Sequence, residues 1–357
     1  MHIAILTGGG DCPGLNAVIR AVSLALIQQC GARVSGVERG FLGLIEQRLR
    51  PLALADVRDI LAQGGTILGT HNRCDPFHYF AEGGADVSAR VLDFVRAQGI
   101  DALVAIGGDG TMAIAEQFSR LGLPVVGVPK TIDNDLYLTE RSFGFDSAVA
   151  VVSEALDRLE TTARSHGRVM IAETMGRHAG WIALEGGLAG GADAILLPEL
   201  PYRLEAVIEH CRRRTEGGGH ALICVAEGAH AQAQSQVVRA LLADSPDPVR
   251  LGGIGALLAQ QLQQALGEHS EVEVRSTLLG HVQRGGTPTA FDRVLATQFG
   301  WAAAQLVREG RFGRMVALQG AEFTSVALAE VAGRNRLVPL DHPLLQAARG
   351  LGLCLGQ

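Results

Sequence analysis

The sequence IAILTGGGDCPGL, residues 3–15, contains an apolar run, a glycine-rich turn and the first residue of a stretch with apolar residues at three- and four-residue spacing. This order predicts a strand over 2–6, a loop, and a helix over 15–29. The glycines let backbone amides approach a phosphate, and the helix N-terminus adds the positive end of its dipole. The stretch is neither a Walker A loop nor GxGxxG, so taken alone a plain strand-to-helix turn explains it equally well.

The same alternation continues along the chain. Further strands are predicted over 32–37, 102–106, 124–128, 168–173, 194–198, 220–226 and 273–279, and further helical stretches over 89–98 and 148–164. Alternating strands and helices predict an α/β fold with mainly parallel sheets. Because 357 residues exceed the length at which one core stops growing, we expect two domains. In open α/β sheets, ligands bind at the loops that follow the carboxyl ends of strands.

Composition excludes several classes of function. The net charge of −6 provides no basic stripe for nucleic acid, and no uncharged apolar run of about 18 residues predicts a membrane span. The N-terminus has no secretory n-region or h-region, which favours the cytoplasm. The six cysteines form no CxxC pair, so we expect buried thiols in a reducing compartment and no cysteine chemistry.

A second glycine loop, IGGDGT at residues 106–111, also lies between an apolar strand and a helix. Its glycines admit a polyphosphate, and the carboxylate of Asp109 is placed to hold Mg²⁺, a hard cation that prefers oxygen ligands. An aspartate that merely caps the following helix is the alternative interpretation.

The third loop, PKTIDND at residues 129–135, carries two carboxylates that flank Asn134. Phosphoryl transfer requires positioning, charge neutralisation and a base, so Asp133 is the candidate base and Asp135 a positioning or metal-linked partner. Such a turn is usually structural, but three phosphate-type loops within 135 residues weaken that reading. The loop also holds Lys130, the single lysine among 31 cationic residues, which predicts a site that needs an ammonium.

Later motifs supply cations for an anionic second substrate. They are Arg168, Met175-Gly176-Arg177, Glu227, Arg275 and His281-Val282-Gln283-Arg284. The arginine fork suits phosphate oxygens, and a glutamate among arginines can accept hydrogen bonds from sugar hydroxyls. Each residue alone is more often a surface residue. Together with the three loops they predict a kinase of a phosphorylated sugar.

These stretches closely resemble the phosphofructokinase family. The matching segments follow the family's order through most of the chain: Gly9-Gly10-Asp11, Gly108-Asp109-Gly110, Thr131 to Asp135, Met175-Gly176-Arg177 and Gly280 to Gly286. The resemblance implies two similar three-layer α/β domains facing across a cleft. Residues 1–144 plus 282–332 would bind the nucleotide and Mg²⁺, and residues 145–281 plus 333–357 would bind fructose 6-phosphate.

By matching position, the resemblance also implies individual roles. The donor and Mg²⁺ would be bound by Gly10, Arg73, Cys74, Asp109, Gly110, Thr111 and Met112, with Asp109 as the metal ligand. The catalytic set would be Lys130, Thr131, Asp133, Asp135 and Arg177. Fructose 6-phosphate would be held by Thr131, Ile132, Asp133, Arg168, Met175, Gly176, Arg177, Glu227, Arg275, His281, Val282, Gln283 and Arg284. Arg168 and Arg275 would come from a neighbouring subunit, which implies a homo-oligomer, a dimer or a tetramer, with shared active sites.

Two positions give a mixed signature for the phosphoryl donor. Lys130 is similar to the pyrophosphate-using branch of the family, whereas Gly110 is similar to the ATP-using branch. An aspartate at 110 would crowd and repel the inner phosphate of a nucleotide, and glycine leaves room. We therefore expect ATP as the co-substrate of a 6-phosphofructokinase of glycolysis. A pyrophosphate-dependent phosphotransferase is the alternative. A non-catalytic sensor of sugar phosphate or nucleotide is a remote one, because both Asp109 and Asp133 are present.

The resemblance also bears on regulation. The effector pocket of the well-regulated bacterial enzymes is lined by basic residues. Here Arg20 is kept, but other basic positions fall on Leu24, Leu54, Glu160 and glycines 217–219. We therefore expect activation by ADP and inhibition by phosphoenolpyruvate through that pocket to be weak or absent.

Overall fold

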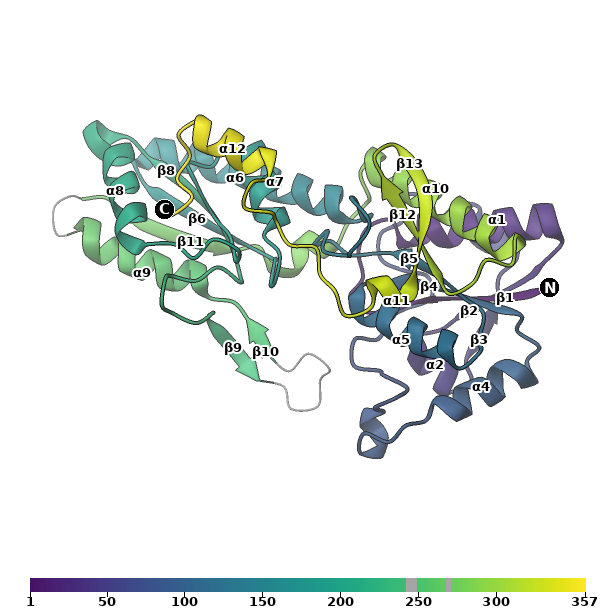
Figure 1. Cartoon of the computed structure of the whole chain (residues 1–357). Coiled ribbons are helices and arrows are strands. Elements are labelled where there is room, and N and C mark those ends of the chain that lie inside the picture. Colours follow the sequence, from purple (N-terminus) through teal and green to yellow (C-terminus); the bar gives the residue numbers. More distant parts are fainter. Residues whose placement is uncertain (242–248, 268–270) are drawn as a thin grey trace. The chain divides into compact units, whose positions relative to one another are not determined.

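The structure is a computed structural model that describes residues 1–241, 249–267 and 271–357 (Figure 1). The chain forms two compact units. Unit 1 contains residues 1–147 and 284–336, and unit 2 contains the described residues of 148–283 together with 337–357. The chain thus passes between units after residues 147, 283 and 336, where the sequence placed the crossings near 144, 281 and 332.

Unit 1 is built on a seven-stranded sheet in the order β13-β12-β5-β4-β1-β2-β3. The strands are β1 (His2–Thr7), β2 (Arg33–Val37), β3 (Leu49–Pro51), β4 (Ala102–Gly107), β5 (Val125–Pro129), β12 (Arg314–Gln319) and β13 (Glu322–Ala327). Neighbouring strands from β12 to β2 are parallel, and only the edge strands β3 and β13 pair antiparallel. The central strands β1 and β4 are buried along their whole length, as expected for parallel strands covered on both faces.

Helices cover both faces of this sheet (Figure 1). One face carries α1 (Leu15–Cys30) and α10 (Ala290–Arg308), and the other carries α2 (Phe41–Ile45), α4 (Ser88–Ala97), α5 (Asp109–Arg120) and α11 (Leu328–Val331). Unit 1 also contains the short elements α3 (Leu54–Val57) and η1 (Phe80–Glu82). The packing of α1 on α10 is close because Gly300 of α10 leaves room where a Cβ would meet Ala21 at 2.7 Å.

Unit 2 has a parallel four-stranded sheet in the order β11-β6-β8-β7. These strands are β6 (Val169–Thr174), β7 (Ala194–Leu196), β8 (Ala221–Ala226) and β11 (Val274–Leu278). A separate antiparallel pair is formed by β9 (Val238–Leu241) and β10 (Val249–Leu251). Parallel strands are joined by long crossover connections, which are again helices in this sheet. Unit 2 therefore repeats the architecture of unit 1 with fewer strands.

The helices of unit 2 pack on both faces of its sheet. A core of apolar residues joins one face to α8 (Leu204–Thr215) and α9 (Ile254–Gly267). The other face is covered by α6 (Phe145–His166) and α7 (Trp181–Ala189), where Gly187 of α7 approaches Ile195 and Cys224. The remaining elements are η2 (Glu216–Gly218), η3 (Gly280–Arg284) and α12 (Pro343–Gly350), which packs on α7.

The predicted fold class is confirmed: both units are α/β, with mainly parallel sheets. All eight predicted strands are present within two residues of their expected ends, although β6 begins at Val169 and leaves Arg168 just before it. The edge and hairpin strands β3, β9, β10, β12 and β13 were not predicted. The expectation that all cysteines are buried was wrong, because Cys30 ends α1 on the surface and Cys354 is only partly covered.

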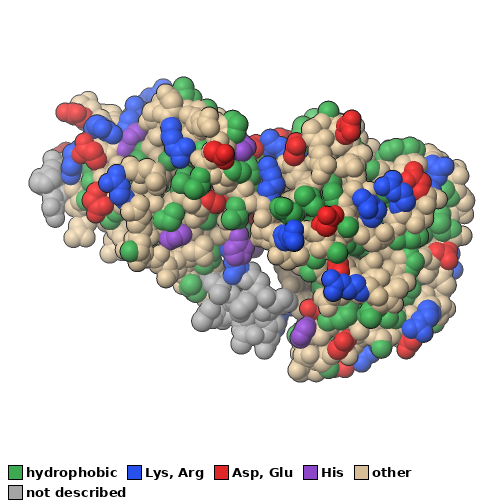
Figure 2. All heavy atoms as spheres, viewed as in Figure 1, with side chains coloured by type: hydrophobic (Ala, Val, Ile, Leu, Met, Phe, Trp, Pro, Cys, Tyr) green, Lys and Arg blue, Asp and Glu red, His purple; other side chains and the backbone are tan. Residues whose placement is uncertain are grey.

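The surface carries charges of both signs. Acidic and basic side chains are interspersed on the face shown in Figure 2, which fits the small net charge. Within the described part of the chain, no helix is long and apolar enough to cross a membrane. The run Arg212-Arg213-Arg214 lies in the last turn of α8, where cations interact favourably with the negative end of the helix dipole.

A buried carboxylate fastens the start of α6 to the start of α10. Oδ2 of Asp292 accepts hydrogen bonds from the backbone N–H of Ser147 at 2.8 Å and from its hydroxyl at 2.6 Å. The hydroxyl of Thr289, which caps α10, donates to Asp146 at 2.6 Å. Burial raises the pKa of Asp292 to about 6, although its hydrogen bonds act in the opposite direction.

We expect this carboxylate to make stability depend on pH. Because the folded-state pKa of Asp292 lies above its unfolded value, its favourable contribution is complete below about pH 4 and is lost as pH rises through about 6, by at most about 3 kcal/mol. The free energies of unfolding of the wild type and of Asp292→Asn, measured in urea and plotted against pH, should therefore converge or cross in that window. A difference in their unfolding free energies that stays constant from pH 4 to 7.5 would contradict this assignment.

Candidate active site

Three predicted loops lie at one edge of the unit 1 sheet. The strands β5, β4 and β1 are parallel neighbours, so the loops at their carboxyl ends must meet there. Backbone hydrogen bonds join them: the N–H of Gly8 donates to Ile106 at 2.9 Å, and the N–H of Lys130 donates to Gly107 at 3.0 Å. The sheet therefore brings together loops that are up to 120 residues apart in the sequence.

The glycines of the first two loops have a definite packing role. Thr111, which is buried in the first turn of α5, fills the space beside Gly8 and Gly107. A Cβ on Gly8 would lie 2.5 Å from the Thr111 hydroxyl, and a Cβ on Gly107 would be closer still. Asp109 and Gly110 are exposed at the start of the same helix, where free backbone amides and the helix dipole favour an anion.

Lys130 is buried with only 3% of its surface exposed. Its ammonium donates a hydrogen bond to the carbonyl of Gly10, so the side chain spans from the third loop to the first. The guanidinium of Arg284 lies beside it and donates to the carbonyl of Asp11 at 3.2 Å. Burial lowers the pKa of Lys130, and the charge of Arg284 lowers it further, whereas Asp11 and Asp133 raise it. The cationic side chains of Lys130 and Arg284 thus hold two successive carbonyls of the first glycine loop, those of Gly10 and Asp11.

The hydroxyl of Thr131 links the carboxylate of Asp135 to the backbone of Asp133. It donates to Oδ1 of Asp135 at 3.2 Å and accepts the backbone N–H of Asp133 at 3.1 Å. Burial raises the pKa of Asp135 to about 7, and the charges of Asp133 and Asp109 add to the effect. Three carboxylates at one sheet edge are therefore an excess of negative charge that a cation would relieve.

Residues outside any predicted motif hold this loop in place. Asn134 adopts a left-handed conformation with φ of 52°, and its amide oxygen accepts the N–H of Ser142 at 3.0 Å. The hydroxyl of Ser142 donates to the carbonyl of Thr131 at 2.7 Å. The N–H of Arg336, the last residue of unit 1 in the sequence, donates to the carbonyl of Asp135 at 2.7 Å. Sequence reasoning missed these supports because they lie in segments without a recognisable pattern.

In unit 2 the residues predicted to bind the sugar phosphate lie on joined loops. The N–H of Glu227 donates to Thr174 at 2.9 Å, and the N–H of Gly228 donates to Gly176 at 3.1 Å. The amide oxygen of Gln283 accepts the N–H of Met175 at 3.2 Å, and its NH₂ donates to Gly280. Because Gln283 is completely buried, its side chain positions these loops and its predicted contact with ligand is not supported.

Arg168 and Arg275 share a carboxylate that the sequence did not reveal. Nε of Arg168 donates to Oε2 of Glu273 at 2.7 Å, and a terminal nitrogen of Arg275 lies 3.4 Å from the same oxygen. The parallel pairing of β11 with β6 brings the three residues together. The two arginines are therefore neighbours at one edge of the unit 2 sheet.

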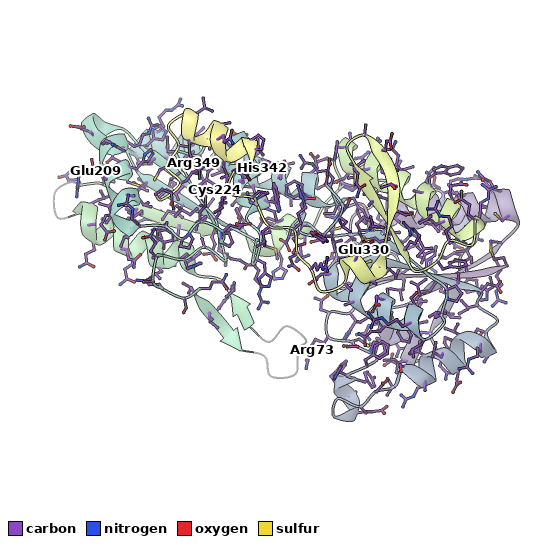
Figure 3. The ribbon with its side chains drawn as sticks, viewed as in Figure 1. Arg73, Glu209, Cys224, Glu330, His342 and Arg349 are labelled. Atoms are coloured by element: carbon purple, nitrogen blue, oxygen red, sulfur yellow. The ribbon has the colours of Figure 1, made fainter. Side chains whose placement is uncertain are left out.

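Three of the residues predicted to bind ligand have buried side chains. Met112 and Cys74 belong to the apolar core of unit 1, and Ile132 is also completely buried. Met112 lies on the buried side of α5, whereas Cys74 and Ile132 lie in loops whose side chains pack inward. Their contacts with a ligand stay predictions. By contrast, Arg73 is exposed and its guanidinium lies 5.3 Å from the centre of the Phe80 ring (Figure 3).

In the described part of the chain, no three His, Cys, Asp or Glu side chains are grouped closely enough to hold a metal on their own. Mg²⁺ does not require such a group, because it is usually bound by one or two carboxylates together with substrate phosphates and water. An exposed Asp109 beside a phosphate-binding helix N-terminus, with the surplus charge of Asp135 and Asp133 nearby, fits that mode.

The glycine loops, the exposed carboxylate of Asp109 and the separate basic set fit a phosphotransferase that acts on an alcohol group, and the comparisons with known proteins show this class. The chain belongs to the phosphofructokinase family, whose model, described as "Phosphofructokinase", matches residues 2–307. It is 48% identical to ATP-dependent 6-phosphofructokinase 2 of Clostridium perfringens, over 98% of this chain and 97% of that one. It is 50% identical to the pyrophosphate–fructose 6-phosphate 1-phosphotransferase of Amycolatopsis methanolica, over 96% and 97%.

Solved structures agree with this assignment. Phosphofructokinase from Saccharomyces cerevisiae superposes with a TM-score of 0.77 at 33% identity, over 92% of this chain. This chain spans only 45% of that longer one, and 35% of the phosphofructokinase chain from Pichia pastoris. The pyrophosphate-dependent phosphofructokinase of Marinobacter aquaeolei, with a TM-score of 0.79 at 23% identity over 100% of this chain and 89% of that one, shares the fold.

The packing of Thr111 gives a test of the donor loops. Gly107→Ala should force Thr111 aside and destabilise unit 1 by about 1–3 kcal/mol in urea unfolding. Gly110→Ala is the matched control, because no atom lies within 4 Å of a Cβ there and its φ is ordinary. Equal stability of the two variants would show that the glycine at 107 is not needed for packing.

Proposed function

We propose that the chain is an ATP-dependent 6-phosphofructokinase, which transfers the γ-phosphoryl group of Mg-ATP to the 1-hydroxyl of fructose 6-phosphate. The observation that carries the proposal is the loop of Asp133 and Asp135 at the sheet edge that also holds both glycine loops. In this loop the Thr131 hydroxyl joins the Asp135 carboxylate to the backbone N–H of Asp133. A base, a phosphate cradle and a helix N-terminus in one place are the components that phosphoryl transfer requires.

In the proposed reaction, the carboxylate of Asp133 accepts the proton of the sugar 1-hydroxyl. The oxygen of that hydroxyl forms a bond to the γ-phosphorus as the bond to the β-phosphate oxygen breaks, and ADP leaves. The pKa of Asp135 near 7 lets it hold a proton at neutral pH, which reduces repulsion at the neighbouring base. Asp109 would hold Mg²⁺, which supplies neutralisation of the phosphate charge when bound.

The sugar phosphate would be held by the unit 2 loops that carry Met175, Gly176, Arg177 and Glu227, together with His281 and Val282. Glu227 is partly exposed at the end of β8, where its carboxylate can accept hydrogen bonds from sugar hydroxyls. Arg284 lies against the donor loop of unit 1, so we assign it to neutralising charge near the transferred group. Arg177 supplies a second guanidinium for the same purpose.

One structural feature favours ATP as the donor, and a second removes an argument for pyrophosphate. The position of a Cβ on Gly110 is open space, so the glycine is not required by packing and leaves room for a nucleotide's inner phosphate. Lys130, the feature that favoured pyrophosphate, donates its hydrogen bond to Gly10, and that contact serves the loop whichever donor binds. Relatives of both donor types are similarly identical to this chain, which keeps pyrophosphate as the alternative.

We further propose a homo-oligomer with shared active sites. Arg168 and Arg275 are adjacent at a sheet edge, and Arg275 keeps 57% of its side chain exposed. We expect both guanidiniums to contact the 6-phosphate of a sugar bound to a neighbouring copy. The state, dimer or tetramer, can be read from light scattering.

A donor assay tests the proposed function. Purified enzyme with saturating fructose 6-phosphate and Mg²⁺ should make fructose 1,6-bisphosphate from ATP, and far more slowly from pyrophosphate. Gly110→Asp should lose ATP use first while remaining folded, because the added side chain meets no protein atom within 4 Å at its Cβ. Faster turnover of the wild type with pyrophosphate would favour the alternative donor.

A substitution tests the assigned base. Asp133→Asn should lower kcat by about 10²–10⁴-fold and change the affinity for fructose 6-phosphate far less, because the carboxylate acts in the transition state. Sugar binding is measured by calorimetry without the donor. Turnover near that of the wild type would exclude Asp133 as the base.

A further inference from the structure

Arg39 lies beside the first glycine loop, in a segment without any assigned role. It follows the carboxyl end of β2, the strand next to β1. In the adjoining Gly40 a Cβ would meet the carbonyl oxygen of Thr7 at 2.7 Å and lie 3.7 Å from Cα of Gly8. The turn at 39–40 is therefore packed directly against the start of the glycine loop.

The backbone of Arg39 has a φ of 60°, in the left-handed region that favours glycine. A non-glycine residue there is disfavoured, and such residues are often found at functional sites. The N–H of Arg39 donates to Leu68 at 2.8 Å, and its Cγ lies 3.5 Å from the Cβ position of Gly69, which fixes the stem of the side chain. Among the residues that the structure describes, its guanidinium has no hydrogen bond or ion pair.

Gly69, which lies next to the Arg39 side chain, and Thr70 after it are hydrogen-bonded to the first glycine loop and the strand before it. The hydroxyl of Thr7 donates to Gly69 at 2.8 Å, and the hydroxyl of Thr70 donates to the carbonyl of Gly9 at 2.5 Å. His71 comes next, and its ring stacks on Phe80 with centroids 5.5 Å apart. The guanidinium of Arg73 lies over the same Phe80 ring at 5.3 Å. Phe80 thus contacts both His71 and Arg73, directly after residues 69 and 70, which contact Arg39 and the glycine loop.

The charges around His71 are mainly positive. Burial lowers its pKa, Arg39 and Arg73 lower it further, and Glu46 alone acts to raise it. Glu46 is itself paired with Arg48 at 2.9 Å. Nδ1 of His71 accepts the backbone N–H of Arg73 at 3.3 Å, so the neutral ring carries its proton on Nε2 and can donate one hydrogen bond. A cluster of this charge beside a phosphate loop is suited to a polyphosphate.

We propose that Arg39 and His71 are two further donor-binding residues, which contact phosphate oxygens of the donor other than those of the transferred group. This inference rests on the proposed function only in taking the ligand to be a polyphosphate. Arg39 contributes a guanidinium fork and a positive charge, and His71 contributes its Nε2–H. Both recognise phosphate and neither recognises a nucleoside.

Arg39→Gly is the decisive variant, because it removes the side chain and places glycine where the backbone has a left-handed conformation. Calorimetry without sugar should show ATP and tripolyphosphate binding about ten- to a hundredfold more weakly than to the wild type, with an unchanged urea midpoint. The control is Arg33→Gly, which removes an exposed arginine at the opposite end of the same strand and should leave both affinities unchanged.

Unchanged affinity in Arg39→Gly would overturn the proposal, as would an equal loss in Arg33→Gly. A loss confined to ATP would place Arg39 against the nucleoside and contradict the phosphate assignment. Because binding is measured without turnover, an inactive wild type that still bound tripolyphosphate through Arg39 would refute the proposed function and leave this inference standing.

A second measurement follows His71 itself. Saturating tripolyphosphate should raise the pKa of His71, seen in the NMR titration of its ring and assigned with His71→Gln, because the anion opposes Arg39 and Arg73. A pKa of His71 that does not move on saturation would remove His71 from the site.

Discussion

The hydrogen bond from the Lys130 ammonium to the Gly10 carbonyl is the contact on which the donor site depends. The N–H of the same residue donates to Gly107, so this one residue contacts the loops that follow both β1 and β4 from its own loop after β5. A buried ammonium is costly unless it is hydrogen-bonded and close to opposite charge. Asp11 and Asp133 provide that charge, which means that the base and the glycine loop are stabilised by one cation.

A lysine at such a site can either bind phosphate with its charge or hold the protein backbone in place, and the contacts of Lys130 show the second role. A flexible, exposed lysine acts mainly as a mobile charge for phosphate, whereas Lys130 is held within the protein and its first partner is a carbonyl. We therefore propose that Lys130 contributes to catalysis by keeping the glycine loop in one conformation. Arg284 acts in the same way, because its guanidinium donates a hydrogen bond to the carbonyl of Asp11 in the same loop.

Much of the architecture follows from the sequence because parallel strands buried on both faces are continuous apolar runs. The edge strand β13 was missed because it is mostly only partly buried, so its apolar pattern is weak. β12, its neighbour in the same hairpin, was missed with it. The three site loops were predicted for a related reason, since each directly follows a recognisable strand. The supports from Ser142 and Arg336 required the tertiary fold, because nothing local marks them.

Side-chain direction was the least predictable feature of the site. Met112 and Gln283 stand at positions matched to binding residues, yet one is in the core and the other holds two loops together. Arg39 shows the reverse case, because no motif contains it and only its left-handed backbone and its neighbours draw attention to it. Glu273 similarly became visible only when β11 and β6 were paired.

The most direct test of the account is a crystal structure with a non-hydrolysable ATP analogue, Mg²⁺ and fructose 6-phosphate. The account predicts that the γ-phosphorus lies about 3–3.5 Å from the sugar 1-hydroxyl, with Asp133 within hydrogen-bonding distance of that hydroxyl. It also predicts that the Lys130 ammonium remains on the Gly10 carbonyl. A Lys130 that had left Gly10 for the phosphate, or a γ-phosphate remote from Asp133, would contradict it.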